Sequence, residues 1–416
     1  MGQCKGLLLV LLALTVLVAC QRGSPPFECT DAIGCVTIQP EEPLEIGVIQ
    51  ALSGEVAPLG IDQVRGLELA LAARGGQLLG HPVHLHSEDD LCSREGGTVA
   101  AEKLKGMPQL VAIFGTTCSG AAVPAAKILS AAGLTMISGG NTAPSLTAVN
   151  GQAGGDWQPG YFRTAPNDAN QGRAAATFVF QQLGVRKAAT INDGDVYTQG
   201  LAEVFGQVFT ELGGEIVLAT AINKGDTEMK PVLEAVAAAG AELLFFPLFE
   251  PESHFIALQA KEVAALAEIN LMTGEGSFTP TFVETVGSSG VGVYFVSPAT
   301  PQSAAYETFV ANYQATYQQA PGSPLLGAAY DAANLLLDTL AQVAVQEEGG
   351  TIHLGRQALR DALYATTGYA GLTGALTCDK FGDCGPARFK VARLDDPAAG
   401  FARLAGNVVY TYHSGE

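Results

Sequence analysis

Short apolar runs alternate along the chain with longer segments in which apolar residues recur every three or four positions. The runs LEIGVIQ, HPVHLHSED, LVAIFG and LTMISGG are typical of strands. Helical periodicity marks the segments between them, at residues 62–76, 96–106 and 121–133. Strands that alternate with helices in this way predict a mostly parallel sheet covered by helices.

The same alternation restarts after YFRTAPND and predicts a second α/β lobe. Its expected strands are KAATIND, EIVLATA, ELLFFPL and INLMTGE, and its expected helices cover residues 168–184, 198–212, 228–239 and 253–266. Three long helices follow, at 302–319, 326–346 and 355–366. After them come two short β-like pieces, GLTGALTCDK and ARFKVARLDD, which need partners formed earlier in the chain.

These late elements indicate that the chain passes between the lobes more than once. We expect it to return to the first lobe at about residue 297 and to cross again near 371. Lobe 1 would then comprise residues 44–164 and 297–371, and lobe 2 would comprise residues 165–296 and 372–416.

The N-terminus carries the pattern of an export signal. One lysine precedes an apolar run from Leu7 to Val18, which is too short to span a bilayer as a stable helix. The run leads into LVAC, which resembles the lipobox of bacterial lipoproteins and implies cleavage before Cys20 and a diacylglycerol on its sulfur. We therefore expect a signal peptide at 1–19 and a lipidated tether at 20–43. The alternative is an ordinary secretory signal with a chance cysteine.

Charge and composition narrow the class of protein. The 416 residues include 22 Lys and Arg against 41 Asp and Glu, a formal net charge of −19, and no basic run occurs. Such a chain would repel phosphate backbones, so nucleic-acid binding is excluded. Hydrophobic residues make up 48% and charged residues 15%, which is typical of a compact protein with room for two cores.

Export into an oxidising compartment favours disulfides. Cys4 lies in the signal and Cys20 is the lipid site, which leaves six of the eight cysteines. One of the fifteen connectivities joins neighbours in sequence and then the remaining two: Cys29 with Cys35, Cys378 with Cys384, and Cys92 with Cys118. A zinc site is the alternative, but the chain has no CxxC motif and no histidine at ligand-like spacing from a cysteine. We expect neither a metal nor another cofactor.

Two hydroxyl residues follow predicted strand ends. Ser119 follows LVAIFG and begins a helix, and Thr142 stands in the same relation to LTMIS. Ligands of open α/β sheets bind beyond the carboxyl ends of strands, where helix N-termini offer unpaired N–H groups. Both residues could thus bind one carboxylate, and the alternative is that both only cap helices. A nucleophilic role for Ser119 is disfavoured, because the chain has no GxSxG motif and no histidine motif that would place a base beside it.

Five stretches together resemble the leucine/isoleucine/valine-binding proteins of ABC importers. They are EIGVIQALSGEVAPLGIDQVRGLELALAARGGQLLGHPVHLHSEDDLCS, IFGTTCSGAAVPAAKILSAAGLTMISGGNTAPSLT, YFRTAPNDANQGRAAA, NDGDVYTQGLAE and LMTGEG, in order from about residue 44 to 390. The resemblance implies the type I periplasmic binding fold, an α/β fold of two Rossmann-like lobes joined by three hinge crossings. It also implies a protein without catalytic activity that works with the membrane subunits of an ABC permease.

The resemblance assigns roles to single residues. It implies a disulfide between Cys92 and Cys118, a ligand carboxylate on Ser119 and Thr142, an ammonium near the backbone of Gly140 and Asn141, and contacts in the second lobe from Tyr197 and Glu275. Glu275 is the expected partner of the α-ammonium. A zwitterion needs donors at one end and an anion at the other, and placing them on different lobes favours closure around the ligand.

Two positions depart from the family pattern. Leu59 stands where family members often carry an aromatic residue, and Phe249 replaces a frequent tyrosine. The anchor for an amino acid is retained and the side-chain pocket is altered, so we expect a small apolar amino acid of branched-chain type. The alternatives are an amide-, urea- or sensory-type relative of the same fold and, from another class, an exported serine hydrolase that uses Ser119.

Overall fold

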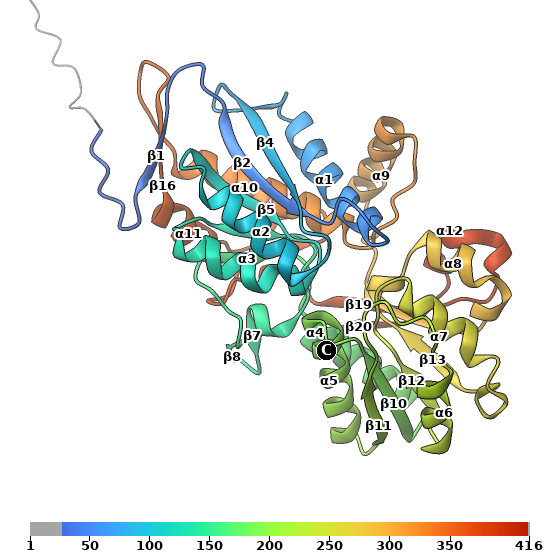
Figure 1. Ribbon diagram of the computed structural model, residues 1–416. Helices are drawn as coiled ribbons and strands as arrows, with labels where there is room; N and C mark the ends of the chain where they lie inside the picture. The colour runs from blue at the N-terminus through green and yellow to red at the C-terminus, as the bar shows by residue number, and fades with distance from the viewer. Residues whose placement is uncertain (1–26, 415–416) are drawn as a thin grey trace, which may run out of the picture.

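Two α/β lobes form the protein, and the computed structural model describes residues 27–414 (Figure 1). The expected signal peptide and Cys20 lie outside the described residues. Within residues 27–414 no helix combines the length and the apolar character needed to cross a membrane.

Lobe 1 is built on a six-stranded sheet. Its strand order is β3 (Gln77–Leu78), β4 (His81–Asp89), β2 (Leu44–Gln50), β5 (Leu110–Gly115), β6 (Met136–Ser138) and β9 (Tyr161–Arg163). The short β3 is antiparallel to β4, and the other neighbours are parallel. All six residues of β5 are buried, as expected for a parallel strand with helices on both faces.

Helices from both ends of the chain cover this sheet. They are α1 (Ala57–Ala72), α2 (Arg94–Lys105), α3 (Ser119–Ala131), α9 (Ala304–Tyr317), α10 (Leu326–Val343) and α11 (Arg356–Tyr364). One core joins the sheet to α1, α10 and α11, and the core on the other face joins it to α2 and α3. In Figure 1 the orange α10 and α11 accordingly lie in the same lobe as the blue β2.

Lobe 2 has a seven-stranded sheet. Its order is β11 (Glu215–Ala221), β10 (Lys187–Asn192), β12 (Leu243–Phe245), β13 (Asn270–Thr273), β14 (Tyr294–Pro298), β19 (Arg388–Arg393) and β20 (Val408–His413). The strands from β11 to β14 are parallel neighbours. The chain's last two strands extend the sheet in the antiparallel sense, which gives the late β-like pieces the partners they need.

Helices cover both faces of this second sheet as well. They are α4 (Asp168–Thr177), α5 (Val196–Glu211), α6 (Lys230–Ala238), α7 (Glu252–Ala260), α8 (Pro280–Val286) and α12 (Gly400–Gly406). α4 and α5 contribute to the core on one face, and the other four contribute to the core on the opposite face. Two pairs of very short strands stand apart from the large sheets: β7 (Ala148–Val149) with β8 (Gln152–Ala153), and β17 (Tyr369–Ala370) with β18 (Ala375–Leu376).

The prediction that the folded part begins at Leu44 is wrong. β1 (Cys35–Ile38) pairs antiparallel with β16 (Ile352–Gly355), which in turn pairs with β15 (Val345–Gln346). This pairing buries Val36 and Ile38 in the core of lobe 1. The end of the expected tether is therefore a strand, held by a partner from the far end of the chain.

The predicted crossing near residue 371 is also placed too early. Leu376, Cys378 and Cys384 belong to the core of lobe 1, and the backbone N–H of Cys384 donates to the carbonyl of Arg163 at 2.9 Å. The chain therefore leaves lobe 1 only between Cys384 and the start of β19. The polar, glycine-containing sequence of this segment shows no periodicity that indicates its packing partner, which is why the sequence places the crossing too early.

Candidate ligand-binding site

The predicted site residues meet where the lobes touch, at the carboxyl ends of parallel strands. Ser119 begins α3 after β5, Tyr197 lies in the first turn of α5 after β10, and Glu275 follows β13 directly. Seven of the eight predicted ligand residues, all except Asn141, line one cavity of about 370 Å³.

One end of the cavity presents hydroxyl groups from lobe 1. The Ser119 hydroxyl oxygen accepts hydrogen bonds from the backbone N–H groups of Thr142 and Ala143, each at 3.2 Å. The N-cap of α3 is Cys118, and no side chain caps this helix. Thr142 begins no α-helix, because only a three-residue 3-10 turn, Pro144–Leu146, follows it. Ser119 therefore joins two loops instead of acting as a cap, and it leaves its own proton free for an acceptor.

Two neighbouring positions of the same loop behave differently. The Asn141 side chain turns away from the cavity and bonds to Thr116 and to the hydroxyl of Tyr161, so it holds the loop in place. Gly140 lines the cavity, and a Cβ at this position would collide with the amide of Gln63. The loop thus needs glycine for a close approach to α1.

Lobe 2 contributes an anionic group to the cavity, directly beside the hydroxyl of Thr142. Glu275 is 4% exposed, accepts a hydrogen bond from Thr142 Oγ1 at 3.3 Å across the lobes, and accepts another from Gln171 Nε2. Burial raises the pKa of the Glu275 carboxyl, and the hydrogen bond from Gln171 opposes that shift. A buried carboxylate with two donors is a suitable partner for an ammonium group.

A second buried carboxylate stands beside the first. Asp168 is fully buried, and neither of its oxygens accepts a hydrogen bond of standard geometry from residues 27–414, although the Thr142 hydroxyl lies near enough to oppose the rise of its pKa. Burial and, next to it, the charge of Glu275 raise the pKa of Asp168 well above its usual range. The buried cation in this region, Arg163, is paired with Asp383 at 2.5 Å. The pair of carboxylates therefore favours a cationic group from outside the chain.

Sequence reasoning missed five polar residues at or beside this site: Gln63, Thr117 and Ser323, which line the cavity, and Asp168 and Gln171, which lie behind Glu275. Asp168 and Gln171 are three positions apart, on one side of α4, within the stretch NDANQGRAAA that carries the family resemblance. Gln63 lines the cavity from α1, and its buried side-chain oxygen has no hydrogen-bond partner in residues 27–414. The helical spacing of Asp168 and Gln171 is a sequence feature that could have indicated them as site residues. No comparable feature marks Gln63.

Much of the remaining wall of the cavity is apolar. Leu59 and Phe249 line it as predicted, together with Pro324 and Leu325, which the sequence did not indicate. The rings of Tyr197 and Phe249 are 4.9 Å apart, and the Tyr197 hydroxyl accepts from the backbone N–H of Gly276 at 3.2 Å. This wall matches a compact hydrocarbon side chain.

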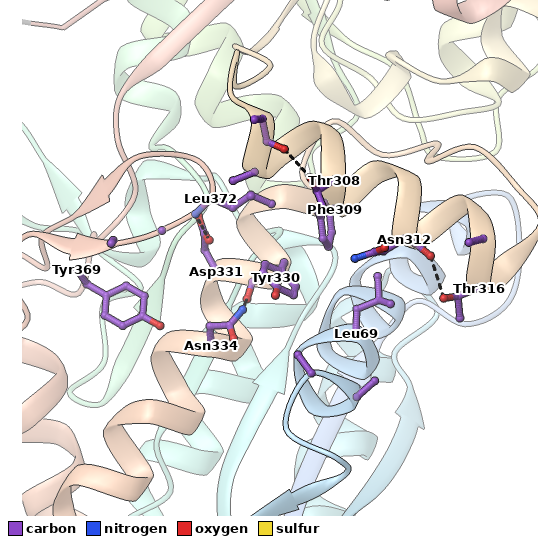
Figure 2. A pocket seen from close by; sticks show the side chains of 17 residues that line it. Leu69, Thr308, Phe309, Asn312, Thr316, Tyr330, Asp331, Asn334, Tyr369 and Leu372 are labelled. Atoms are coloured by element: carbon purple, nitrogen blue, oxygen red, sulfur yellow. Dashed lines mark hydrogen bonds between the residues drawn. The ribbon is translucent and has the colours of Figure 1, made fainter.

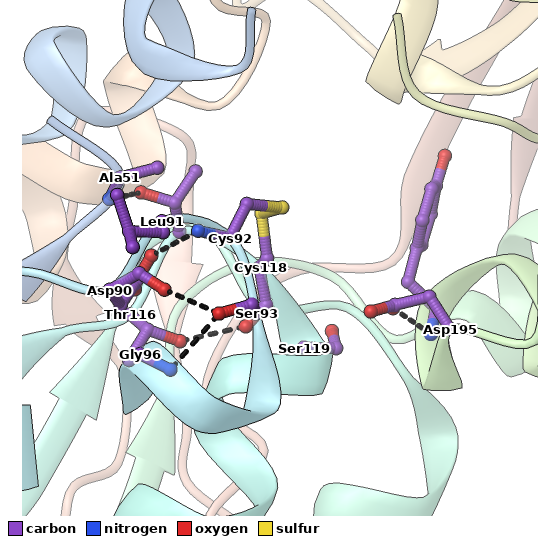
Figure 3. The surroundings of a disulfide bond; sticks show 12 residues. Ala51, Asp90, Leu91, Cys92, Ser93, Gly96, Thr116, Cys118, Ser119 and Asp195 are labelled. Atoms are coloured by element: carbon purple, nitrogen blue, oxygen red, sulfur yellow. Dashed lines mark hydrogen bonds between the residues drawn. A yellow bond between two sulfur atoms is a disulfide. The ribbon is translucent and has the colours of Figure 1, made fainter. Parts of the chain in front are cut away.

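The structure has the three disulfides that the sequence predicts: Cys29–Cys35, Cys92–Cys118 and Cys378–Cys384. Figure 3 shows the second of these at the start of α3, with Ser119 directly beyond it and Asp195 of lobe 2 across the interface. The side chain of Lys224, also from lobe 2, donates to the carbonyl of Cys92 at 2.8 Å. Cys118 is therefore a structural residue that fixes the loop in front of Ser119.

We expect the double substitution of Cys92 and Cys118 by alanine to lower the free energy of unfolding. Their 26-residue separation predicts a loss of about 3.5 kcal/mol in the chain-entropy model. The same change at Cys29 and Cys35, which are 6 apart, serves as the matched control with an expected loss of about 2.4 kcal/mol. Urea unfolding measures both losses. Equal losses in the two variants would contradict the dependence on loop length.

A wider groove lies elsewhere on lobe 1, between α1, α9 and α10 (Figure 2). None of the predicted ligand residues lines it. The carboxylate of Asp331 in its wall is already bonded to the backbone N–H groups of Leu372 and Thr373. Convergent polar groups without partners are found at the contact between the lobes and not here, so the smaller cavity is the candidate site.

These features define the class of two-lobe proteins that bind a small ligand between two α/β lobes. The chain belongs to the periplasmic binding protein family, whose model matches residues 43–391. This family membership confirms the predicted type I periplasmic binding fold.

Individual relatives agree with this assignment. The chain is 26% identical over 357 residues to Leu/Ile/Val-binding protein homolog 3 of Brucella melitensis, an alignment that covers 85% of this chain and 92% of that protein. It is 29% identical over 245 residues to an amino acid binding protein of Pseudomonas aeruginosa, covering 58% of this chain and 63% of that relative's length.

Solved structures share the fold. The leucine binding protein LivK of Thermotoga maritima has a TM-score of 0.76 at 22% identity, over 89% of this chain and 99% of that one. LivJ of Streptococcus pneumoniae, solved with isoleucine, has a TM-score of 0.73 at 22% identity, with the same coverage. A solute binding protein of R. palustris, solved with benzoate, has a TM-score of 0.73 at 23% identity, over 89% and 96% of the two chains.

Proposed function

We propose that this chain is a lipid-anchored binding protein of an ABC importer, which captures an apolar amino acid of branched-chain type outside the cytoplasmic membrane and delivers it to the permease. One observation carries the proposal: the hydroxyl groups of Ser119 and Thr142 from lobe 1 and the carboxylate of Glu275 from lobe 2 line the same enclosed cavity. Only a closed cleft meets both charged ends of an amino acid, so ligand binding stabilises closure.

Mass spectrometry of ligand released from the purified protein, followed by calorimetric titration, tests the proposal. Leucine, isoleucine or valine should bind and be recovered unchanged. Recovery of a hydrolysed product would instead favour the exported hydrolase. In residues 27–414 no histidine ring nitrogen hydrogen-bonds to Ser119, whose hydroxyl oxygen accepts from backbone N–H groups, so the Ser–His pair of a serine hydrolase is not formed there.

Aromatic carboxylates are a second candidate class, because a similar structure was solved with benzoate. Benzoate would satisfy the hydroxyl end of the cavity and fit its apolar wall. It has no nitrogen, however, and would leave the buried carboxylates of Asp168 and Glu275 without a counter-charge. We therefore expect benzoate to bind at least tenfold more weakly than leucine, and the same titration decides between the two classes.

The lipid anchor is tested at Cys20, which lies outside the described residues. Because LVAC ends an apolar run of signal-peptide length, Cys20→Ala should abolish lipidation and release the protein from the membrane fraction. Cell fractionation and the intact mass of the protein measure this. Retained lipid on the variant would contradict the proposed anchor and leave the ligand assignment untouched.

A further inference from the structure

A second cavity adjoins the ligand cavity at the contact between the lobes. Its volume is about 440 Å³, and it shares Leu59 and Gly276 with the ligand cavity as common walls. Val56 and Pro58 of lobe 1 line it on one side, and Thr279 of lobe 2 lines it on the other. The outer cavity, as we call it, therefore begins where the apolar wall of the inner site ends.

Glu250 supplies a buried carboxylate to the outer cavity. It is only 7% exposed, and one of its oxygens accepts a hydrogen bond from Thr279 Oγ1. The other oxygen lies 3.5 Å from His254 Nε2, which has no hydrogen-bond partner among the described residues. A carboxylate has about four acceptor positions. Thr279 and His254 approach Glu250 at one position on each oxygen, so the carboxylate keeps capacity for a further donor.

The charged residues that line the outer cavity are all acidic. Glu55 lines it as well as Glu250, and no Lys, Arg or His is among its lining residues in the described chain. A ligand group that reaches this space exchanges water for a low-dielectric surrounding with a negative charge. A cationic nitrogen gains most from that exchange, whereas a methyl group gains nothing from the carboxylate.

The wall between the two cavities suits hydrocarbon. Leu59 borders both of them, and Phe249, the neighbour of Glu250 in sequence, lines the inner one. A side chain that leaves the α-carbon must therefore pass apolar groups before it reaches the carboxylate. An unbranched side chain of methylene groups that ends in a charged group matches this arrangement, because it is apolar near the α-carbon and charged at its end.

We propose that the outer cavity is a subsite for the terminal cationic nitrogen of a long side chain, so that the cleft binds lysine-like amino acids with Glu250 as the distal partner. The inference rests on the proposed function, because the α-amino and carboxyl groups must occupy the inner site. It extends the ligand class from compact apolar amino acids to amino acids with a methylene stem and an amino terminus.

Calorimetric titration with lysine and norleucine tests this, because norleucine has the methylene stem without the nitrogen. Wild type should bind lysine at least tenfold more tightly than norleucine. Glu250→Gln should remove that preference and leave norleucine affinity unchanged, which also shows that the variant is folded. Glu55→Gln, in the exposed part of the wall, is the matched control and should change the lysine affinity less than threefold.

Two results overturn the subsite. One is a wild type that binds norleucine as tightly as lysine, and the other is a Glu250→Gln variant that keeps the lysine preference. In either case, binding of norleucine or leucine leaves the proposed function standing. Failure of lysine, norleucine and leucine alike to bind would reject the amino-acid function itself, and the subsite with it, so the two failures are distinguishable.

Discussion

Glu275→Gln is expected to weaken leucine binding about 30-fold to several thousand-fold. The closed cleft excludes water around the ammonium, and the substitution replaces its anionic partner with a neutral amide. Removing one member of a buried charge pair costs roughly 2–5 kcal/mol, which corresponds to that range of affinity. Glutamine has the same shape. Its single oxygen can still accept from Gln171, and its NH2 group can donate to the Thr142 hydroxyl, which then acts as the acceptor, so the free energy of unfolding should change little.

A thermodynamic cycle isolates the ammonium contact. Leucine and 4-methylpentanoate, which lacks the amino group, are each titrated into wild type and Glu275→Gln. The effect of the substitution should largely vanish for the ligand without nitrogen. If 4-methylpentanoate binds wild type as tightly as leucine does, Glu275 is not the ammonium anchor and the amino-acid proposal fails.

Acid provides a second readout of the same contact. Burial raises the pKa of Glu275, and burial with the charge of Glu275 raises that of Asp168, in the cleft without ligand. A bound ammonium favours the charged carboxylates and lowers both pKa values, so binding releases protons. Leucine affinity should therefore fall as the pH falls through the raised values, and the fall should be smaller in Glu275→Gln.

The sequence located the parts of the site that follow strands. Ser119, Tyr197 and Glu275 come just after β5, β10 and β13, so the topology of parallel sheets brings them to one edge. Asp168 and Gln63 lie on helices, where a polar residue is usually solvated. Their burial depends on how α4 and α1 pack between the lobes, and that packing is not encoded in local periodicity.

The errors in the lobe boundaries have the same origin. β1 is recognisable as a strand only through its pairing with β16. The place of Cys384 in lobe 1 is recognisable only through its backbone hydrogen bond to Arg163. In both cases the partner lies far away in sequence, while local composition resembles a linker. Periodicity predicts elements and their order, but it does not identify which short strand or turn completes a distant core.

Arg163 makes the most consequential of these distant contacts. It is fully buried in β9 and donates to Asp383 at 2.5 Å, to the carbonyl of Ala143 at 2.7 Å and to Thr147 Oγ1 at 2.6 Å. Through these bonds Arg163 connects the segment that contains Asp383, just before the chain's last crossing into lobe 2, to the loop that carries Thr142. One side chain therefore connects the hinge region to the carboxylate end of the ligand site.

Arg163→Met is accordingly expected to lower the free energy of unfolding by about 3–5 kcal/mol, because it strands the Asp383 carboxylate and the loop carbonyls. Urea unfolding measures the loss. Arg173→Met, at an exposed position of α4, is the matched control and should change stability by no more than about 0.5 kcal/mol. Adding Asp383→Leu to Arg163→Met should restore part of the stability, since the half-buried Asp383 carboxylate, which has lost its cation, is then removed as well. A single variant within about 1 kcal/mol of wild type would show that this ion pair does not hold the ligand loop.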